Sequence, residues 1–478
     1  MRFAPDIALG RRIVGLAAPA VLAMLSQTAV NLLDTAMVGR LPGATGIDGV
    51  AGIGISLPLF WAIGGFLSAI AIGTQAITAR RVGEGERKLA GRVLGNSLFI
   101  AATTGLTVSV LGYLLIPSFF PLLNPNPNVV RLGSAYCRLR MLGIFSMVST
   151  IAYKGFFDGI GKTYVHMIAS VVMNVLNAFL NAVLIFGLLG FPRLEVEGAA
   201  LASLISTFVG LAVMIGWSLA PAIRREFAIY RLRNLRLKVA GEIVRLSVPS
   251  GLATIFVMSG FEFFLWVTGR IHSDPLWISP LGFTPLLGPV LDTAELAAPD
   301  LATSASWVMI SLLMIVFMTS IALGTATATL VGQSLGGRDA ALAERYGWES
   351  VKIGMYVMGA LGLAVIVWPE PFLGVFTDKR QVIEVAAAPM RMMGAVFALM
   401  SAGLILVQAL FGAGATTFVM LAEMTLHGLF LIPFSYLTAL TFGWGLMGAW
   451  ISVAAYVILL SSVMALKFRG GSWKHIRL

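Results

Sequence analysis

Residues 302–333 read ATSASWVMISLLMIVFMTSIALGTATATLVGQ and contain no Asp, Glu, Lys or Arg. A helix that crosses a lipid bilayer needs roughly 20 such residues. The rest of the chain is similar, because 58% of its 478 residues are hydrophobic, only 12% are charged, and the mean hydropathy is +0.90. Soluble domains carry about 25% charged residues. The composition therefore predicts a protein that crosses the membrane several times.

Twelve runs of this kind can be counted along the chain, and each predicts one transmembrane helix. They cover residues 12–38, 51–79, 89–115, 137–157, 163–189, 197–220, 243–271, 302–333, 346–368, 387–411, 417–442 and 445–467. The predicted fold class is therefore an all-α polytopic membrane protein with twelve transmembrane helices.

The basic residues predict how the chain is oriented in the membrane. An even number of spans places both termini on one side, and the loops on that side hold 24 of the 33 Lys and Arg residues. Cytoplasmic loops carry such an excess. We therefore expect both termini in the cytoplasm, and a bacterial inner membrane fits best. Because the basic residues lie in short gaps between apolar runs, nucleic acid is not an expected partner.

Matching motifs indicate that the chain contains an internal repeat. Pro19 and Pro249 each open a span at an offset of 230 residues. The motif RMLG at 140–143 matches RMMG at 391–394, at an offset of 251 residues. The motifs recur in the same order, so two six-helix units run in the same direction. Parallel repeats of this kind are a transporter architecture with the pathway between the halves.

The repeat divides the chain into two pseudo-symmetric six-helix bundles, residues 1–220 and 243–478. They are joined by a basic cytoplasmic linker, 221–242. The change in offset marks an extracytoplasmic insertion at 272–301, which is acidic and has no Lys or Arg. The insertion is interpreted either as a tolerated surface loop or as a lid that collects cations.

Asp34 is the strongest functional candidate, because an ionisable side chain inside a span is costly and usually functional. Gln27 lies seven residues earlier, so the two share one face of the first span. A carboxylate partly removed from water gains proton affinity and can bind and release H⁺ or Na⁺ as its access alternates. The alternative is an outer-end residue that reaches the lipid headgroups.

The stretch SQTAVNLLDTAMVG at 26–39, behind Pro19, resembles the first span of the multidrug and toxic compound extrusion family. In that family a Pro is followed by a Gln eight residues later and by an Asp fifteen residues later. NVLNAFLNAVLIFG at 174–187 is similar to the family's Asn-rich motif, and GTATATLVGQSLGG at 324–337 to its Gly-Gln-x-Leu-Gly ending. The resemblance covers the whole chain.

The resemblance implies a cation-coupled antiporter that exports amphiphilic cationic drugs or metabolites by alternating access, driven by H⁺ or Na⁺. It makes Asp34 the coupling carboxylate, and Asn177 and Asn181 complete the polar pocket with Gln27. A Na⁺ ion would bind at Asp34 and Asn177. Some branches carry Asp where this chain has Asn181, which favours either proton coupling through Asp34 alone or a weaker Na⁺ site. The alternative role for the asparagines is interhelical hydrogen bonding.

The second half offers weaker candidates for coupling or substrate binding. Several branches of the family carry Glu eight residues after the proline of the seventh span, where this chain has Val257. Glu262 lies five residues further on and is rotated from the expected face. Its side chain either enters the cavity or stays outside it.

Glu423 and His427, four residues apart in the eleventh span, share one helix face. They form either a proton relay, because His titrates near neutral pH, or a polar pair that satisfies itself. Gln408 is a minor candidate.

No catalytic constellation emerges, so we do not expect an enzyme, and the single cysteine excludes a disulfide within the chain. No cofactor is expected beyond the transported H⁺ or Na⁺. The expected partners are the lipid bilayer and small amphiphilic or cationic substrates, bound by a monomer.

The alternative function is a flippase for lipid-linked precursors. A flippase needs a basic central cavity, and the absence of Arg or Lys near the middle of any predicted span favours cationic or neutral cargo.

Overall fold

The structure, a computed structural model, describes residues 6–41, 44–271 and 301–478. Within these ranges the side chains of residues 28, 29, 31–36, 44–47 and 232 are not described. The side chain of Asp34 therefore falls outside the described part of the chain. The same holds for the predicted insertion 272–301, apart from Leu301.

The described residues form helices and no strand. The first half contains α1 (Ile7–Gly39), α2 (Ala44–Ser68), α3 (Ile70–Gly83), α4 (Arg87–Phe119), α5 (Pro127–Leu142), α6 (Ile144–Gly159), α7 (Tyr164–Phe186), α8 (Glu195–Leu219) and the short α9 (Pro221–Phe227). The second half contains α10 (Leu237–Thr268), α12 (Leu301–Gly336), α13 (Ala340–Val367), α14 (Pro369–Gly374), α15 (Arg380–Ala413), α16 (Thr416–Thr425), α17 (Ile432–Tyr436) and α18 (Gly445–Arg469).

Short helical turns of other types complete the list. The 3₁₀ turns are η1 (Phe120–Leu122), η2 (Leu188–Gly190), η3 (Leu232–Asn234) and η7 (Ser472–His475). Two π-helical segments, η5 (Leu426–Leu431) and η6 (Leu437–Thr441), interrupt the predicted span 417–442 on either side of α17. The predicted linker 221–242 holds α9 and η3, and its last six residues already belong to α10.

Eleven helices among the described residues are long and apolar enough to cross a bilayer. The predicted span 137–157 is not one of them, and it is shared between α5 and α6, which meet at Gly143. The backbone of Gly143 remains near the helical region (φ −72°, ψ −12°), so α6 continues from α5. Two arginines also interrupt the apolar run, and they stack on aromatic rings: Arg138 on Tyr113 at 4.3 Å and Arg140 on Phe60 at 4.4 Å. Together α5 and α6 make the twelfth crossing.

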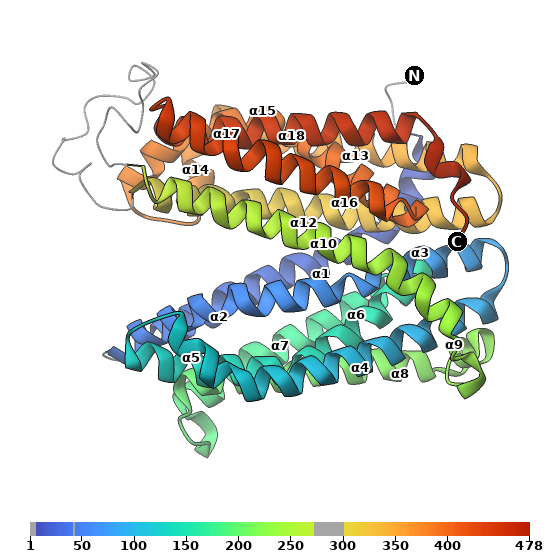
Figure 1. The fold of residues 1–478 in the computed structure, drawn as a ribbon, viewed down its shortest axis with the longest axis horizontal. Coiled ribbons are helices and arrows are strands. Elements are labelled where there is room, and N and C mark those ends of the chain that lie inside the picture. The colour runs from blue at the N-terminus through green and yellow to red at the C-terminus, as the bar shows by residue number, and fades with distance from the viewer. Residues whose placement is uncertain (1–5, 42–43, 272–300) are drawn as a thin grey trace.

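Figure 1 shows the helices of the first half as one bundle and those of the second half as another. Helix α1 belongs to both. Its first turns bury Ile13 and Ala17 in an apolar cluster with second-half residues such as Phe411, and Arg12 donates to the hydroxyl of Tyr346 on α13 at 3.2 Å. Further along, α1 packs against α7 and α8 of its own half. It therefore ties the two bundles together.

The bundle surface is suited to lipid. Large apolar side chains on the spans remain exposed, among them Phe99, Leu114, Leu363 and Leu466 at 52%, 62%, 66% and 69%. Exposed apolar surface spread over so many helices indicates contact with a membrane. The chain is therefore a multi-pass membrane protein, as its composition predicts.

The two halves meet at one end of the molecule, which also holds both ends of the described chain (Figure 1) and is called the terminal end below. Here α3 and α12 touch through their backbones. A Cβ atom on Gly83 would collide with the carbonyl oxygen of Gln333, and one on Gly336 with the carbonyl oxygen of Arg80. Only glycine, which lacks a Cβ atom, permits this approach.

Buried hydrogen bonds cross the same seam between the halves. Gln75 of α3 donates to the carbonyl oxygen of Thr325 and to the hydroxyl of Thr329 on α12, both at 2.9 Å. The Thr329 hydroxyl in turn lies 2.9 Å from the carbonyl oxygen of Asp158 at the end of α6. The terminal end is therefore closed by both close packing and polar contacts.

Residues 470–478, called the C-terminal strap, cross this seam. Trp473 is fully buried and stacks on Phe468 of α18, with ring centroids 4.5 Å apart. Beyond this anchor, the carbonyl oxygen of Ile476 accepts a hydrogen bond from the guanidinium of Arg80 on α3 at 2.7 Å. The strap thus links the second half to the first.

Candidate functional site

Three asparagines form a buried polar stripe on α7. Asn174, Asn177 and Asn181 follow a spacing of three and four residues, which places them on one helix face, and none is more than 5% exposed. We call these three residues the asparagine ladder. Buried amides require hydrogen-bond partners, so the contacts of this stripe define what it can do.

The partners of the asparagine ladder come from α1, α7 and α8. Asn174 donates to the Ser26 hydroxyl on α1 at 2.8 Å, and Asn177 donates to the Ser203 hydroxyl on α8 at 3.2 Å. Asn181 donates to the side-chain oxygen of Asn177 at 3.2 Å. The ladder therefore lies between α7, α1 and α8, inside the first half.

Helices α1 and α7 run in the same direction. At the terminal end, the hydroxyl of Thr163, just before α7, donates to the carbonyl oxygen of Leu16 on α1 at 2.8 Å. The next contact joins Asn174, eleven residues after Thr163, to Ser26, ten residues after Leu16. The residue numbers therefore rise together along both helices. Gln27 follows Ser26 and is half-buried. Position 34 also lies on α1, two turns beyond Gln27, but its side chain is outside the described part.

A second polar cluster lies in the second half, at the junction of α16 and η5. The Nδ1 atom of His427 lies 3.2 Å from Oε2 of Glu423 and 3.0 Å from the carbonyl oxygen of the same residue. The hydroxyl of Tyr456 on α18 donates to the same Oε2 at 2.8 Å. Glu423 and His427 are 5% and 3% exposed. The structure therefore brings the predicted pair together, and we call the three residues the Glu–His–Tyr cluster.

Close packing holds the imidazole of this cluster in place. The His427 and Tyr456 rings lie with centroids 4.5 Å apart. On the other side, a Cβ atom on Gly260 of α10 would lie only 2.5 Å from Cδ2 of His427. The ring therefore fills the space that this glycine leaves open.

Glu262 does not join the Glu–His–Tyr cluster. It lies two residues after Gly260, which turns its side chain about 200° around α10 from the face that touches His427. Instead it shares a face with Gly251, three turns earlier, which lies against Phe66 of α2 in the first half. Glu262 itself is exposed. It therefore lies on the side of α10 that is turned toward the first half, at a level where that half no longer covers it.

Gln408 also stands apart from both clusters. It is half-buried on α15, and its side chain packs against Gly324 of α12, where a Cβ atom would lie 2.6 Å from Cγ of Gln408. Its surroundings are those of a helix-packing residue.

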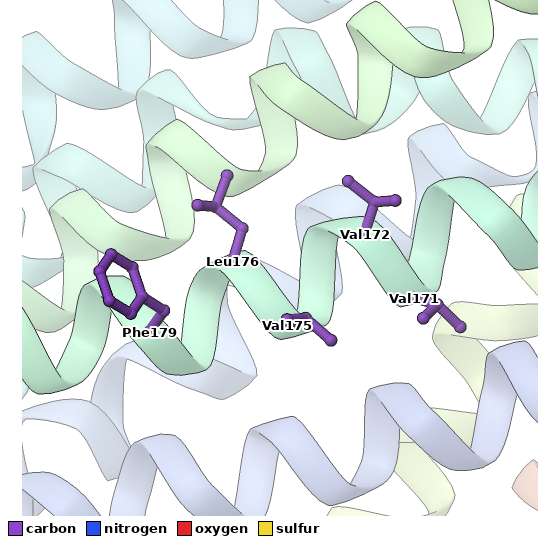
Figure 2. A pocket seen from close by; sticks show the side chains of 5 residues that line it. All are labelled: Val171, Val172, Val175, Leu176 and Phe179. Atoms are coloured by element: carbon purple, nitrogen blue, oxygen red, sulfur yellow. The ribbon is translucent and has the colours of Figure 1, made fainter.

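An apolar hollow of about 520 Å³ is lined by residues of α7. All five lining side chains, Val171, Val172, Val175, Leu176 and Phe179, come from this single helix (Figure 2). Their spacing places them on the face opposite the asparagine ladder. The hollow is therefore part of the outer surface of the first half and is separate from the polar stripe.

Sequence reasoning missed several members of both polar clusters. Asn174 lies within the quoted Asn-rich motif, and its three-residue spacing from Asn177 is a signal that could have identified it. Ser203 and Tyr456 lie on other spans than the residues they contact. No local spacing indicates such contacts, which follow only from the packing of the helices.

The family model described as MatE matches residues 19–183 and 293–437 of this chain. The probable multidrug resistance protein NorM of Thermotoga maritima is 26% identical over 470 residues, which cover 97% of this chain and 93% of that protein.

Two solved structures share the fold. MATE in complex with MaL6 has a TM-score of 0.84 at 21% identity, covering 97% of this chain and 96% of the other. The outward-facing conformation of a multidrug resistance MATE family transporter of the MOP superfamily has a TM-score of 0.83 at 21% identity, covering 97% and 95%. The two matched segments of the family model span well over half of the chain, which therefore belongs to the MatE family, a family of transporters and not of enzymes.

Proposed function

We propose that this transporter is an antiporter that exports amphiphilic cationic compounds by alternating access, coupled to the entry of H⁺ or Na⁺ at Asp34. The names of its relatives, which are probable multidrug resistance proteins, support this class of cargo. The bacterial origin of these relatives supports an inner-membrane location. The observation that carries the proposal is the buried asparagine ladder, because it supplies polar partners along α1 where the coupling carboxylate is expected.

Helix geometry supports the pairing of Asp34 with the ladder. From the contact between Ser26 and Asn174, Asn181 lies seven residues along α7 and position 34 lies eight residues along α1. Since the two helices run in the same direction and rise about 1.5 Å per residue, positions 34 and 181 fall at nearly the same level. A buried carboxylate is costly unless it is paired or hydrogen-bonded, and buried amides at the same level can lower that cost.

The coupling follows from charge. An ionised Asp34 favours a bound cation, whether this is H⁺, Na⁺ or a cationic substrate, and occupancy by one cation disfavours another. Each net positive charge that moves inward gains about 2.3 kcal/mol per 100 mV of membrane potential. Exchange of one H⁺ or Na⁺ for one monovalent cation moves no net charge, and the concentration gradient of the coupling ion then drives export. Asn181 is an amide and adds no second charge, so we expect H⁺ to be the coupling ion. An ion site at Asp34 and Asn177 would instead bind Na⁺.

The closed seam supports an outward-facing state of the proposed antiporter. The distribution of basic residues predicts that the terminal end lies in the cytoplasm, and closure of this end would then correspond to the outward-facing state. Glu262, exposed on the face of α10 turned toward the first half, is then open to the outer side. We propose that its carboxylate attracts cationic cargo between the halves.

The test is efflux of a fluorescent cationic dye from proteoliposomes under a pH gradient or a Na⁺ gradient imposed separately. We expect wild-type efflux under one gradient and efflux at the level of protein-free liposomes for Asp34→Asn. Asp378→Asn, the same change at an exposed position between α14 and α15, is the matched control and should transport normally. Full activity of Asp34→Asn would refute the coupling role. A wild-type protein that moves no dye under either gradient would refute the antiport itself.

A further inference from the structure

The Glu–His–Tyr cluster has a defined pattern of hydrogen bonds. Nδ1 of His427 faces two acceptors, the carbonyl oxygen and the carboxylate of Glu423, so this nitrogen carries a proton. The Tyr456 hydroxyl donates to the same carboxylate oxygen. Glu423 therefore accepts bonds from two donors on different helices, so its carboxylate, the imidazole and the phenol form one hydrogen-bonded unit.

No other charge balances this cluster in the described part of the chain. On α10, Gly260 contacts the imidazole, and Glu262 is turned away. On α15, no charged residue follows Arg391, and on α17 the titratable residue is Tyr436. On α18, Lys467 lies eleven residues beyond Tyr456, with its ammonium 4.6 Å from the ring of Phe418, more than a turn before Glu423. The cluster must therefore balance its charge internally.

The internal balance requires one proton on the pair. With one proton shared between Glu423 and His427, the pair is neutral, either as carboxylate and imidazolium or as carboxylic acid and imidazole. Loss of that proton leaves a buried anion, and gain of another leaves a buried cation. Both carry a large desolvation cost. Proton exchange is therefore expected when the helices around the cluster separate and admit water.

The backbone around His427 also departs from a regular helix. The π-helical segment η5 begins one residue before His427. Such segments are rare and are frequently found at functional sites. The π-helical backbone is therefore an observation that does not depend on the side-chain contacts.

We propose that Glu423, His427 and Tyr456 form a proton-binding site in the second half, separate from the site at Asp34. Glu423 and His427 hold the proton, and Tyr456 positions the carboxylate. Its contribution to transport rests on the proposed antiport, whereas the binding of a proton there does not. Release of this proton would leave a negative charge that favours a cation on the second-half side of the pathway.

The first experiment measures the proton directly, without transport. Infrared difference spectra of the full-length protein in lipid, recorded between pH 5 and pH 9, show the bands of carboxyl groups that change protonation. We expect a carboxyl band, distinct from those of exposed carboxyls, that is lost in Glu423→Gln and kept in Asp34→Asn. Glu370→Gln, at a half-exposed side chain paired with Arg391, is the matched control and should keep the band. A carboxyl spectrum of Glu423→Gln identical to that of the wild type would overturn the proposal.

Two milder variants separate a proton site from a structural pair. Tyr456→Phe removes one hydrogen bond, and Gly260→Ala displaces the imidazole, but neither removes the carboxyl group. We expect both to shift the frequency of the Glu423 band without abolishing it. An unchanged frequency in both variants would show that the band does not arise from this cluster.

Dye efflux then tests the role in transport. We expect Glu423→Gln to slow H⁺-driven efflux about tenfold and to flatten its dependence on pH. If the infrared band is present but efflux in Glu423→Gln equals that of the wild type, the proton site has no role in transport. If the band is present while Asp34→Asn transports normally, the proposed coupling at Asp34 fails and the second-half site stands.

Discussion

The two halves bury their polar side chains in opposite ways. The asparagine ladder in the first half consists of three amides, which remain uncharged at every physiological pH. These amides bond to one another and to hydroxyls on α1 and α8. The Glu–His–Tyr cluster in the second half contains a carboxyl group and an imidazole, whose charges depend on the protons that they hold. The first arrangement can orient and coordinate a cation but cannot itself carry charge. The second carries charge that depends on pH.

This difference predicts where pH acts on the molecule. With the proposed carboxylate at Asp34 replaced, damage to the ladder should weaken the protein equally at all pH values, because amides do not titrate in this range. Damage to the cluster should have an effect that depends on pH, because the charge left behind can be neutralised by protonation. The variants below test this contrast, and their effects decrease in order.

His427→Leu should have the largest effect. It leaves the Glu423 carboxylate buried without its partner, and breaking a buried pair in this way costs about 3–5 kcal/mol. Protonation of Glu423 removes the unpaired charge, so the loss should be full at pH 8 and smaller at pH 5. Thermal unfolding in detergent at both pH values measures it. An equal loss at both pH values would contradict a charged Glu423.

Asn177→Leu should come next. It removes the acceptor for Asn181 and the donor to Ser203, and each buried group left unsatisfied costs about 1–3 kcal/mol. In the Asp34→Asn background, which removes the proposed carboxylate at this level, the decrease in unfolding temperature should be the same at pH 5 and pH 8. A decrease that depends on pH in that background would indicate that the ladder itself contains a titrating group.

Tyr456→Phe should cost less, because it removes one hydrogen bond to the carboxylate and creates no cavity. Hydrogen bonds to charged groups contribute about 1.5–3 kcal/mol, and the phenylalanine ring retains the contact with His427. Because a hydrogen bond to an ionised carboxylate is stronger than one to a carboxylic acid, the loss should be greater at pH 8 than at pH 5. The same unfolding series serves as the measurement, and a greater loss at pH 5 would reverse the assigned direction of the bond.

Ser203→Ala should have the smallest effect. It removes one neutral hydrogen-bond partner of Asn177, which corresponds to about 0.5–1.5 kcal/mol. The loss should again be independent of pH, so that Ser203→Ala and Tyr456→Phe compare one hydrogen bond in each half. If both variants show the same pH profile, the contrast between the two regions is wrong.

Much of the fold could be predicted from the sequence because bilayer spans are apolar over their whole length. The apolar runs identify eleven of the crossings as helices of sufficient length. The crossing at 137–157 was also predicted, but its division at Gly143 was not. The π-helical segments around α17 were not predicted either, because they leave no mark in the hydrophobic pattern.

The candidate site was predictable only in part. Spacing along one helix placed Glu423 and His427 on a common face, and the contact between them follows from that spacing. The same reasoning indicated that Glu262 is rotated from the expected position, and it is exposed on α10. Tyr456 could not be predicted, because its contact with Glu423 joins residues 33 positions apart on different helices. Such contacts depend on how helices pack, which a single sequence does not reveal.

The C-terminal strap has a consequence for how the protein is made. Residues 470–478 follow α18, so the ribosome adds them after all the helices of the two bundles described above. Their bonds to α3, from Arg80 to the carbonyl oxygen of Ile476 and from Arg81 to that of Leu478, cannot form while the helices are being inserted. Because domains generally fold as units during synthesis, the two bundles can fold before they are tied together. Closure of the terminal end by the strap therefore comes after the folding of the two bundles.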